Sequence, residues 1–174
     1  MSQKPTPKRS LIMDACVLID FLKTDRYVIE LVSKYIGPVH VIRPVIDEIG
    51  EIESEEELTE LGMTILEPQL DDAFEAANTI GATSFLDRLC LLTAKRLGYI
   101  CVTNDSNLRR QCEKENVSLL WGLQVLTELH ACGGIPTKTA VDVAEQIRKN
   151  NRTMTVEVMN RYMKVIMDQH HRTP

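Results

Sequence analysis

Short apolar runs alternate with longer helical segments along most of this chain, and that alternation limits the folds open to it. Five of the runs have the length and composition of buried strands. These predicted strands are residues 11–13, 39–42, 63–66, 99–103 and 117–121. Strands that alternate with helices favour an α/β fold with a parallel sheet. We therefore predict a three-layer α/β/α architecture with a central parallel sheet of about five strands and additional C-terminal helices.

The expected helix boundaries coincide with residues that cap or break helices. Ser84 opens a strong apolar pattern that Gly98 closes, as expected of an N-cap and a C-terminal glycine. Pro44 suits the first turn of another helix. We expect helices over residues 15–36, 44–52, 70–79, 84–98, 104–116, 122–134, 137–149 and 154–169, and a helix or a loop over the acidic residues 53–60.

The length of 174 residues allows one domain with a proper hydrophobic core. We expect a flexible N-terminus over residues 1–9 and an α/β domain over residues 10–135. A C-terminal helical extension over residues 136–174 is expected to pack on the same domain. The connection at 133–137, Gly-Gly-Ile-Pro-Thr, is the candidate boundary between them.

The length and the charges of the apolar runs predict where in the cell the protein is located. None of them approaches the roughly 20 residues that a membrane-spanning helix needs. The basic N-terminal segment leads into a stretch that carries Asp14 and Asp20, whereas a secretory signal has an uncharged apolar region there. We therefore expect a cytoplasmic protein without membrane contact.

The cysteines and the net charge argue against several function classes. Five scattered cysteines without a Cys-x-x-Cys pair indicate neither a zinc knuckle nor a redox motif. Three of them, Cys16, Cys90 and Cys101, sit among apolar residues, where we expect cysteine to act as a small hydrophobic core residue. A net charge of −5 opposes bulk electrostatic binding of nucleic acid. However, acids concentrate in residues 47–60, while residues 88–114 and 138–172 carry more Lys and Arg than acids. Local binding of RNA at such basic segments remains open.

Two aspartates fall at the carboxyl ends of predicted strands. Asp14 directly follows the first strand, and Asp105 lies two residues beyond the fourth. In an open parallel sheet, ligands bind beyond the carboxyl ends of the strands, where the strand order reverses. Capping of the following helix accounts for either aspartate alone equally well.

Two further acids lie at the edges of the apolar faces of predicted helices. An unpaired charge in the place of Asp87 is costly, so it needs a partner, and an ion pair with an arginine is the alternative to a site. Glu48 alone would be a solvated helix charge. Four carboxylates from separate elements repel each other unless a cation joins them. Because the ligands are all oxygens, Asp14, Glu48, Asp87 and Asp105 together favour Mg²⁺ or Mn²⁺ over zinc.

These acids and their neighbours, in this order, resemble the PIN-domain family of nucleases, especially its toxin-like members. The matching segments are LIMDACVLIDF, HVIRPVIDEI, SFLDRLCLLTAKRLG, YICVTND and WGLQVLTELHACGGI. The resemblance covers about residues 10–135 and implies a nuclease domain there. It also implies that Asp14, Glu48, Asp87 and Asp105 are both the catalytic and the metal-binding residues.

The activity implied by the resemblance is hydrolysis of phosphodiester bonds in single-stranded or structured RNA, with Mg²⁺ or Mn²⁺ as the cofactor. Thr103, Arg88 and Arg109 are the expected substrate-binding residues. Similar proteins are often toxins of toxin–antitoxin pairs, so an antitoxin partner and a homodimer are implied as well. Many relatives have asparagine where this chain has Cys16, which predicts a weaker outer shell of the site.

Three alternatives compete with a nuclease. A PIN scaffold without catalysis would act only as an RNA- or protein-binding module, and Cys16 and the acidic net charge favour it. A phosphoacceptor receiver domain needs an aspartate after the third strand and a lysine after the fifth, and this chain has neither. Dinucleotide binding lacks the Gly-x-Gly-x-x-Gly segment after the first strand. The histidines show no metal-ligand spacing; they are His40, His130, His170 and His171.

Overall fold

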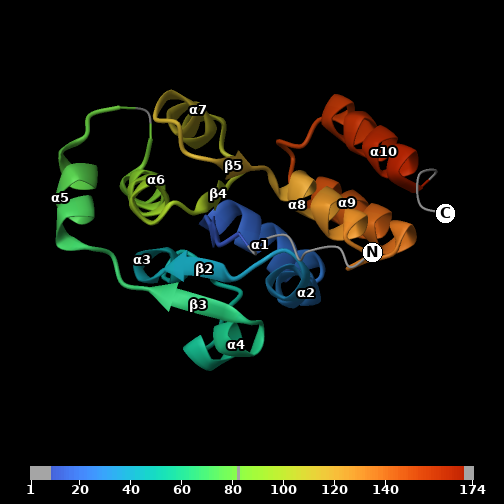
Figure 1. Cartoon of the computed structure of the whole chain (residues 1–174), viewed down its shortest axis with the longest axis horizontal. Helices are drawn as coiled ribbons and strands as arrows, with labels where there is room; N and C mark the ends of the chain where they lie inside the picture. Colours follow the sequence, from blue (N-terminus) through green and yellow to red (C-terminus); the bar gives the residue numbers. More distant parts are fainter. Residues whose placement is uncertain (1–8, 82, 171–174) are drawn as a thin grey trace, which may run out of the picture.

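A parallel sheet of five strands forms the centre of the protein (Figure 1). The structure is a computed structural model and describes residues 9–81 and 83–170. The strands are β1 (Leu11–Met13), β2 (Val39–Ile42), β3 (Met63–Leu66), β4 (Ile100–Val102) and β5 (Leu119–Leu120). Their order across the sheet is β3-β2-β1-β4-β5, and all four pairings are parallel. The chain thus runs outward from β1 to β3 and then returns to add β4 and β5, so the order reverses between β1 and β4.

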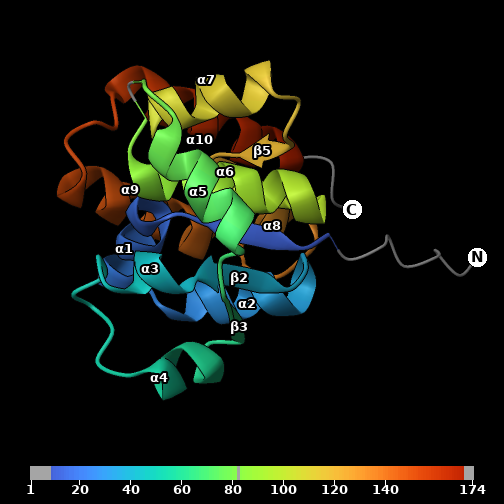
Figure 2. The same ribbon diagram turned by 90° about the vertical axis from the view of Figure 1, so that its left-hand side faces the viewer.

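Helices cover both faces of this sheet, which confirms the predicted three-layer α/β/α fold. Right-handed crossovers place the connections of the two halves on opposite faces. Accordingly α5, α6 and α7 gather on one side of the sheet (Figures 1 and 2), while α1 and α2 lie on the other with α8, α9 and α10. The helices are α1 (Ala15–Thr24), α2 (Tyr27–Tyr35), α3 (Arg43–Ile46), α4 (Glu55–Glu60), α5 (Leu70–Asn78), α6 (Phe85–Leu97), α7 (Ser106–Lys114), α8 (Gly122–Ala131), α9 (Thr137–Asn150) and α10 (Val156–His170).

The extents predicted for two helices, residues 15–36 and 44–52, are wrong. Side-chain capping explains the difference in the first. The single helix over residues 15–36 is broken between α1 and α2, where Asp25 takes an extended backbone and its carboxylate accepts the Tyr27 backbone N–H at 3.1 Å. The helix that begins near Pro44 stops after one turn, at Ile46. The chain continues as a tighter turn, in which the Glu48 backbone N–H bonds to the Val45 carbonyl three residues earlier at 3.1 Å.

The boundaries of α6 follow the sequence pattern. Ser84 is its N-cap, and Gly98 ends it in the left-handed conformation with φ of 68°, which glycine adopts at little cost. The acidic stretch that could have been helix or loop contains the short helix α4, which lies beside β3 at one end of the molecule (Figure 2).

The last two helices pack against the body of the fold. On α10, Met159, Tyr162 and Ile166 are buried, and the Tyr162 hydroxyl donates to the Ala140 carbonyl of α9 at 2.9 Å. In turn, α9 contacts α1 and α8. Of the N-terminus expected to be flexible, residues 1–8 lie outside the described residues. Within residues 9–81 and 83–170, no helix has both the length and the apolar character that crossing a membrane requires.

Candidate active site

The structure brings the four acids singled out in the sequence together around one cavity of about 220 Å³. Asp14 follows β1 and Asp105 follows β4, so these two stand on either side of the point where the strand order reverses. Glu48 reaches the cavity from the turn after α3, and Asp87 from the first turn of α6. The cavity therefore lies at the carboxyl edge of the sheet, where open α/β folds bind ligands.

Asp14 is the most deeply placed of the four, with only 3% of its surface exposed. It is the N-cap of α1, and its carboxylate accepts the Val17 backbone N–H at 3.1 Å. The Thr103 hydroxyl donates to one of its oxygens, and the Cys16 thiol lies 3.0 and 3.1 Å from the two oxygens. Burial raises the pKa of Asp14 to about 6, although these three hydrogen bonds oppose the rise, and the charge of Asp87 adds to it.

Thr103 connects the two strand-end acids. This residue is fully buried, and its hydroxyl donates to Asp14 while accepting the Asp105 backbone N–H at 3.0 Å. Asp105 in turn caps α7, because its Oδ1 accepts the backbone N–H groups of Asn107 and Leu108 at 2.9 and 2.8 Å. Capping and lining of the cavity are thus compatible roles for both aspartates. Thr103 is placed to position the acids, and its burial leaves it little access to a substrate.

Asp87 finds its partner in Ser84 rather than in an arginine. The two residues form a capping box, in which the Ser84 backbone N–H donates to Asp87 Oδ2 at 3.3 Å and the Asp87 backbone N–H donates to Ser84 Oγ at 3.1 Å. The Ser84 hydroxyl also lies 2.7 Å from Asp87 Oδ2. The neighbouring Arg88 points to other acids, since it pairs with Glu75 at 2.9 Å and with Glu115. Binding of a phosphate by Arg88 would therefore require breaking two ion pairs.

Glu48 is exposed, and no hydrogen bond or ion pair of its carboxylate is found within the described segments. The adjacent Asp47 is exposed as well, yet it does not line the cavity. Glu48 is thus free to face a ligand in the cavity. Asp47, with the same charge outside the cavity, is the matched control for it.

A network behind the cavity was missed in the sequence. Asn104 Nδ2 donates to Asp20 at 3.1 Å, and Asn104 Oδ1 accepts the Gly122 backbone N–H at 2.9 Å. Asn151, at the end of α9, also donates to Asp20 at 3.1 Å. Burial raises the pKa of Asp20, and the hydrogen bonds from Asn151 and Asn104 oppose the rise. Asn104 stands inside the segment YICVTND and was within reach of sequence analysis, whereas nothing in the sequence connects Asp20 with Asn151.

The donor set around the cavity fits a hydrated divalent cation. No group of three or more Asp, Glu, His or Cys side chains in residues 9–81 and 83–170 is close enough to ligate one ion directly. Mg²⁺, however, commonly keeps several waters and binds through one or two carboxylates. At about 30 Å³ for each water, the cavity has room for an ion and several of them. Carboxylates that repel each other across such a space are stabilised by a cation.

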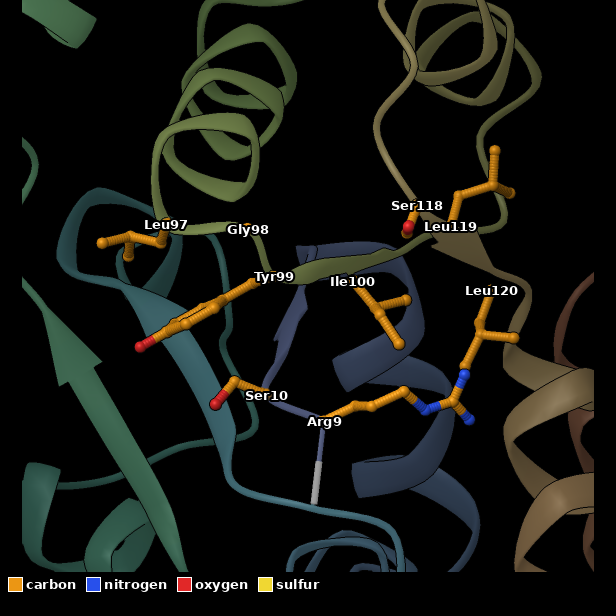
Figure 3. Close-up of a pocket in the computed structure, with 9 residues that line it drawn as sticks. All are labelled: Arg9, Ser10, Leu97, Gly98, Tyr99, Ile100, Ser118, Leu119 and Leu120. Atoms are coloured by element: carbon orange, nitrogen blue, oxygen red, sulfur yellow. The ribbon is translucent and has the colours of Figure 1, made fainter. Parts of the chain in front are cut away.

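A larger cavity of about 590 Å³ opens at the opposite, amino edge of the sheet (Figure 3). Its lining includes Ser10, Tyr99 and Ser118, which precede β1, β4 and β5, together with Arg9. None of its nine lining residues is an acid, a histidine or a cysteine, so it offers no comparable set of metal ligands.

Comparison with known protein families and with curated proteins finds no match. Among solved structures, the chain is similar to PAE2754 from Pyrobaculum aerophilum, with a TM-score of 0.46 and 17% sequence identity. The alignment covers 74% of this chain and 94% of that chain.

Proposed function

We propose that this protein is a metal-dependent ribonuclease of the PIN-domain type. The observation that carries the proposal is the convergence of Asp14, Glu48, Asp87 and Asp105, from four separate elements, on one cavity at the switch point of the sheet. Structural needs alone do not explain this convergence, because helix capping accounts for three of the acids one at a time but not for their common cavity.

The roles of the four acids follow from their environments. Asp14, Asp87 and Asp105 would hold the hydrated ion, in part through its waters, since each is fixed in place by helix capping. When bound, Mg²⁺ or Mn²⁺ polarises the scissile phosphate and lowers the pKa of a water that attacks it. Glu48, exposed and without a partner among the described residues, is free to orient that water and to accept its proton.

The resemblance to toxin-like PIN proteins extends the proposal to partners. We include in it a cytoplasmic location, a homodimer and restraint by an antitoxin protein. Exposed apolar side chains on α5 and just after it, Leu70, Phe74 and Ile80, supply surface of the kind that protein partners cover. In this proposal the protein is the toxin of a toxin–antitoxin pair.

The test of the nuclease is cleavage of a mixed-sequence single-stranded RNA. We expect cleavage with Mn²⁺ or Mg²⁺, none with a chelator, and products that carry a 5′-phosphate. A second measurement does not depend on turnover: Mn²⁺ should raise the melting temperature of the protein, because an ion that binds only the folded state stabilises it. Absence of both effects in folded protein would overturn the proposal.

Glu48→Gln is expected to lower the rate of RNA cleavage by about a hundredfold, the range of a lost general base. Asp47→Asn is the matched control, since it removes the same charge one residue earlier from a side chain that does not line the cavity. The measurement is the initial rate of RNA cleavage by each of the two variants at saturating Mn²⁺. Equal rates for the two variants would remove Glu48 from the site.

A second candidate function is binding without catalysis. It is favoured by the hydrogen bonds that already surround the Asp14 carboxylate, donated by Val17, Cys16 and Thr103. Donors in these positions compete with a cation for the same oxygens. RNA binding that persists without cleavage and without a Mn²⁺-dependent shift in melting temperature would identify this candidate.

A further inference from the structure

The single tryptophan of the chain, Trp121, lies at the edge of the sheet where the acidic cavity is found. Trp121 directly follows β5, the neighbour of β4 in the sheet, so it lies at the same carboxyl edge as Asp105. The Gly122 backbone N–H donates to Asn104 at 2.9 Å, which joins the segment after β5 to the segment that carries Asp105. A Cβ at Gly122 would lie 3.1 Å from Asn104 Nδ2, so the approach of the two segments is close. Strands of one sheet are about 4.8 Å apart, so the backbone at Trp121 follows the strand adjacent to the one that leads to Asp105.

Arg109 stacks on the indole of Trp121. Its guanidinium carbon lies 3.7 Å from the ring centroid, in the range of a cation–π contact. Arg109 belongs to the first turns of α7, where its backbone N–H donates to the Asp105 carbonyl at 3.0 Å. The stacked pair is therefore built on the helix that Asp105 caps.

A mostly apolar cavity of about 390 Å³ adjoins Trp121, between β5, α8 and α10. Trp121 lines it and Arg109 does not, so the cavity and the guanidinium meet different parts of the indole. Its other walls include Leu123, Val158 and Arg161. The volume and the apolar lining with a few polar groups are typical of small-molecule sites.

One cation, Arg161, lines this cavity, and the one carboxylate in its lining, Glu128, pairs with Arg9 at 2.8 Å. Arg109 and Arg161 form no ion pair with a carboxylate in the described part of the chain, whereas Arg88 and Arg96 do. The Nε of Arg109 is also buried, with no hydrogen-bond partner among the described residues. A buried donor without a partner is costly unless a ligand completes it. An aromatic ring that already carries a guanidinium, and a mostly apolar cavity with one unpaired arginine, together match a nucleotide, whose base is aromatic and whose phosphate is anionic.

We infer that Trp121, Arg109 and the adjoining cavity form a nucleobase subsite, in which an unpaired base stacks on the indole next to the phosphate held at the acids. The inference rests on the proposed function and deepens it, because a base can enter such a subsite only when it is not paired. Stacking of unpaired bases on aromatic side chains is the usual mode of single-strand recognition. The substrate is therefore single-stranded nucleic acid, and duplexes are excluded.

The fluorescence of Trp121 tests the subsite directly, because no other tryptophan contributes. The protein carries Asp14→Asn, so that no RNA is cut during the titration. A short single-stranded RNA is expected to quench the emission, whereas the same RNA in a duplex and inorganic polyphosphate, which has charge but no base, leave it unchanged. With a labelled RNA, Trp121→Ala should weaken binding about tenfold or more, and Trp121→Phe should retain most of it.

The charge of Arg109 has its own control. Arg109→Ala is expected to weaken binding of the single-stranded RNA, while Arg148→Ala, which removes an exposed cation of α9, leaves it unchanged. Equal quenching by polyphosphate, or unchanged affinity in Trp121→Ala, would overturn the subsite. Emission that changes on dilution of the protein alone would also overturn it, since a second copy would then occupy the cavity. Quenching in a protein whose wild type never cleaves RNA would support the subsite while the nuclease fails.

Discussion

Asp14→Asn is expected to reduce metal-dependent cleavage of RNA by about a thousandfold or more. Asp14 is the acid most completely fixed in the site, since it is buried and held by Val17, Thr103 and Cys16. Asparagine keeps the size of the side chain but removes the charge that attracts a cation. The loss should appear in the rate at saturating RNA, and added Mn²⁺ should not restore it.

The control for this experiment is Asp142→Asn, which changes an exposed aspartate of α9 that does not line the cavity. It should cleave RNA like the wild type, and it exposes any contaminating nuclease because it is purified in the same way. Retention of more than a tenth of the wild-type rate by Asp14→Asn would mean that the metal is not held through this carboxylate.

The two acids at the strand ends were predictable because a few neighbouring residues are enough to show where a buried strand ends. An apolar run fixes where a strand ends, and parallel strands bring their carboxyl ends to one edge, so Asp14 and Asp105 meet without further information. Asp87 was found for a similar reason: its helix has a clear start at Ser84 and a clear end at Gly98. Each of these signals lies within a few residues of the acid that it places.

Features that depend on distant partners were not predictable. Arg88 and Arg109 are both arginines, and the sequence alone does not distinguish their surroundings. In the structure, Arg88 is neutralised by Glu75 and Glu115, whereas Arg109 stacks on Trp121. Which of two arginines remains free for a ligand is decided by segments that fold beside it. The same holds for Asp20 and Asn151, which meet across 131 residues of sequence.

Glu48 shows a third kind of limit. Its helix was expected to continue because Ile49 and Ile52 extend the apolar pattern from Val45, but the chain leaves the helix at Ile46 and still buries Ile49. A tight turn buries the same apolar side chain as a helix would, so the pattern does not distinguish the two. The turn matters for the proposed function, because Glu48 lines the cavity from an exposed segment.

The same Asp14→Asn variant is expected to be more stable than the wild type when metal is absent. Burial raises the pKa of Asp14 from its ordinary value of 3.8 to about 6 in the folded protein. The folded state therefore binds this proton more tightly than the unfolded chain does. The resulting contribution to stability is fully present below pH 3.8 and is lost as the pH rises through 6. Above that pH the wild type retains a buried charge that asparagine lacks, and the difference in free energy of unfolding should approach about 3 kcal/mol.

Urea unfolding in a chelating buffer at pH 4, 6 and 8 measures this difference. The two proteins should converge at pH 4 and separate at pH 8, with the variant unfolding at the higher urea concentration. Mn²⁺ should then narrow the gap at pH 8 by stabilising the wild type alone, since the variant has lost the charge that attracts the ion. Equal stabilities at pH 8 in the chelator would show that Asp14 is not held as a buried charge. If Mn²⁺ left the difference in stability between the two proteins unchanged, the buried charge of Asp14 would not bind the metal. That result would favour a scaffold that binds without catalysis.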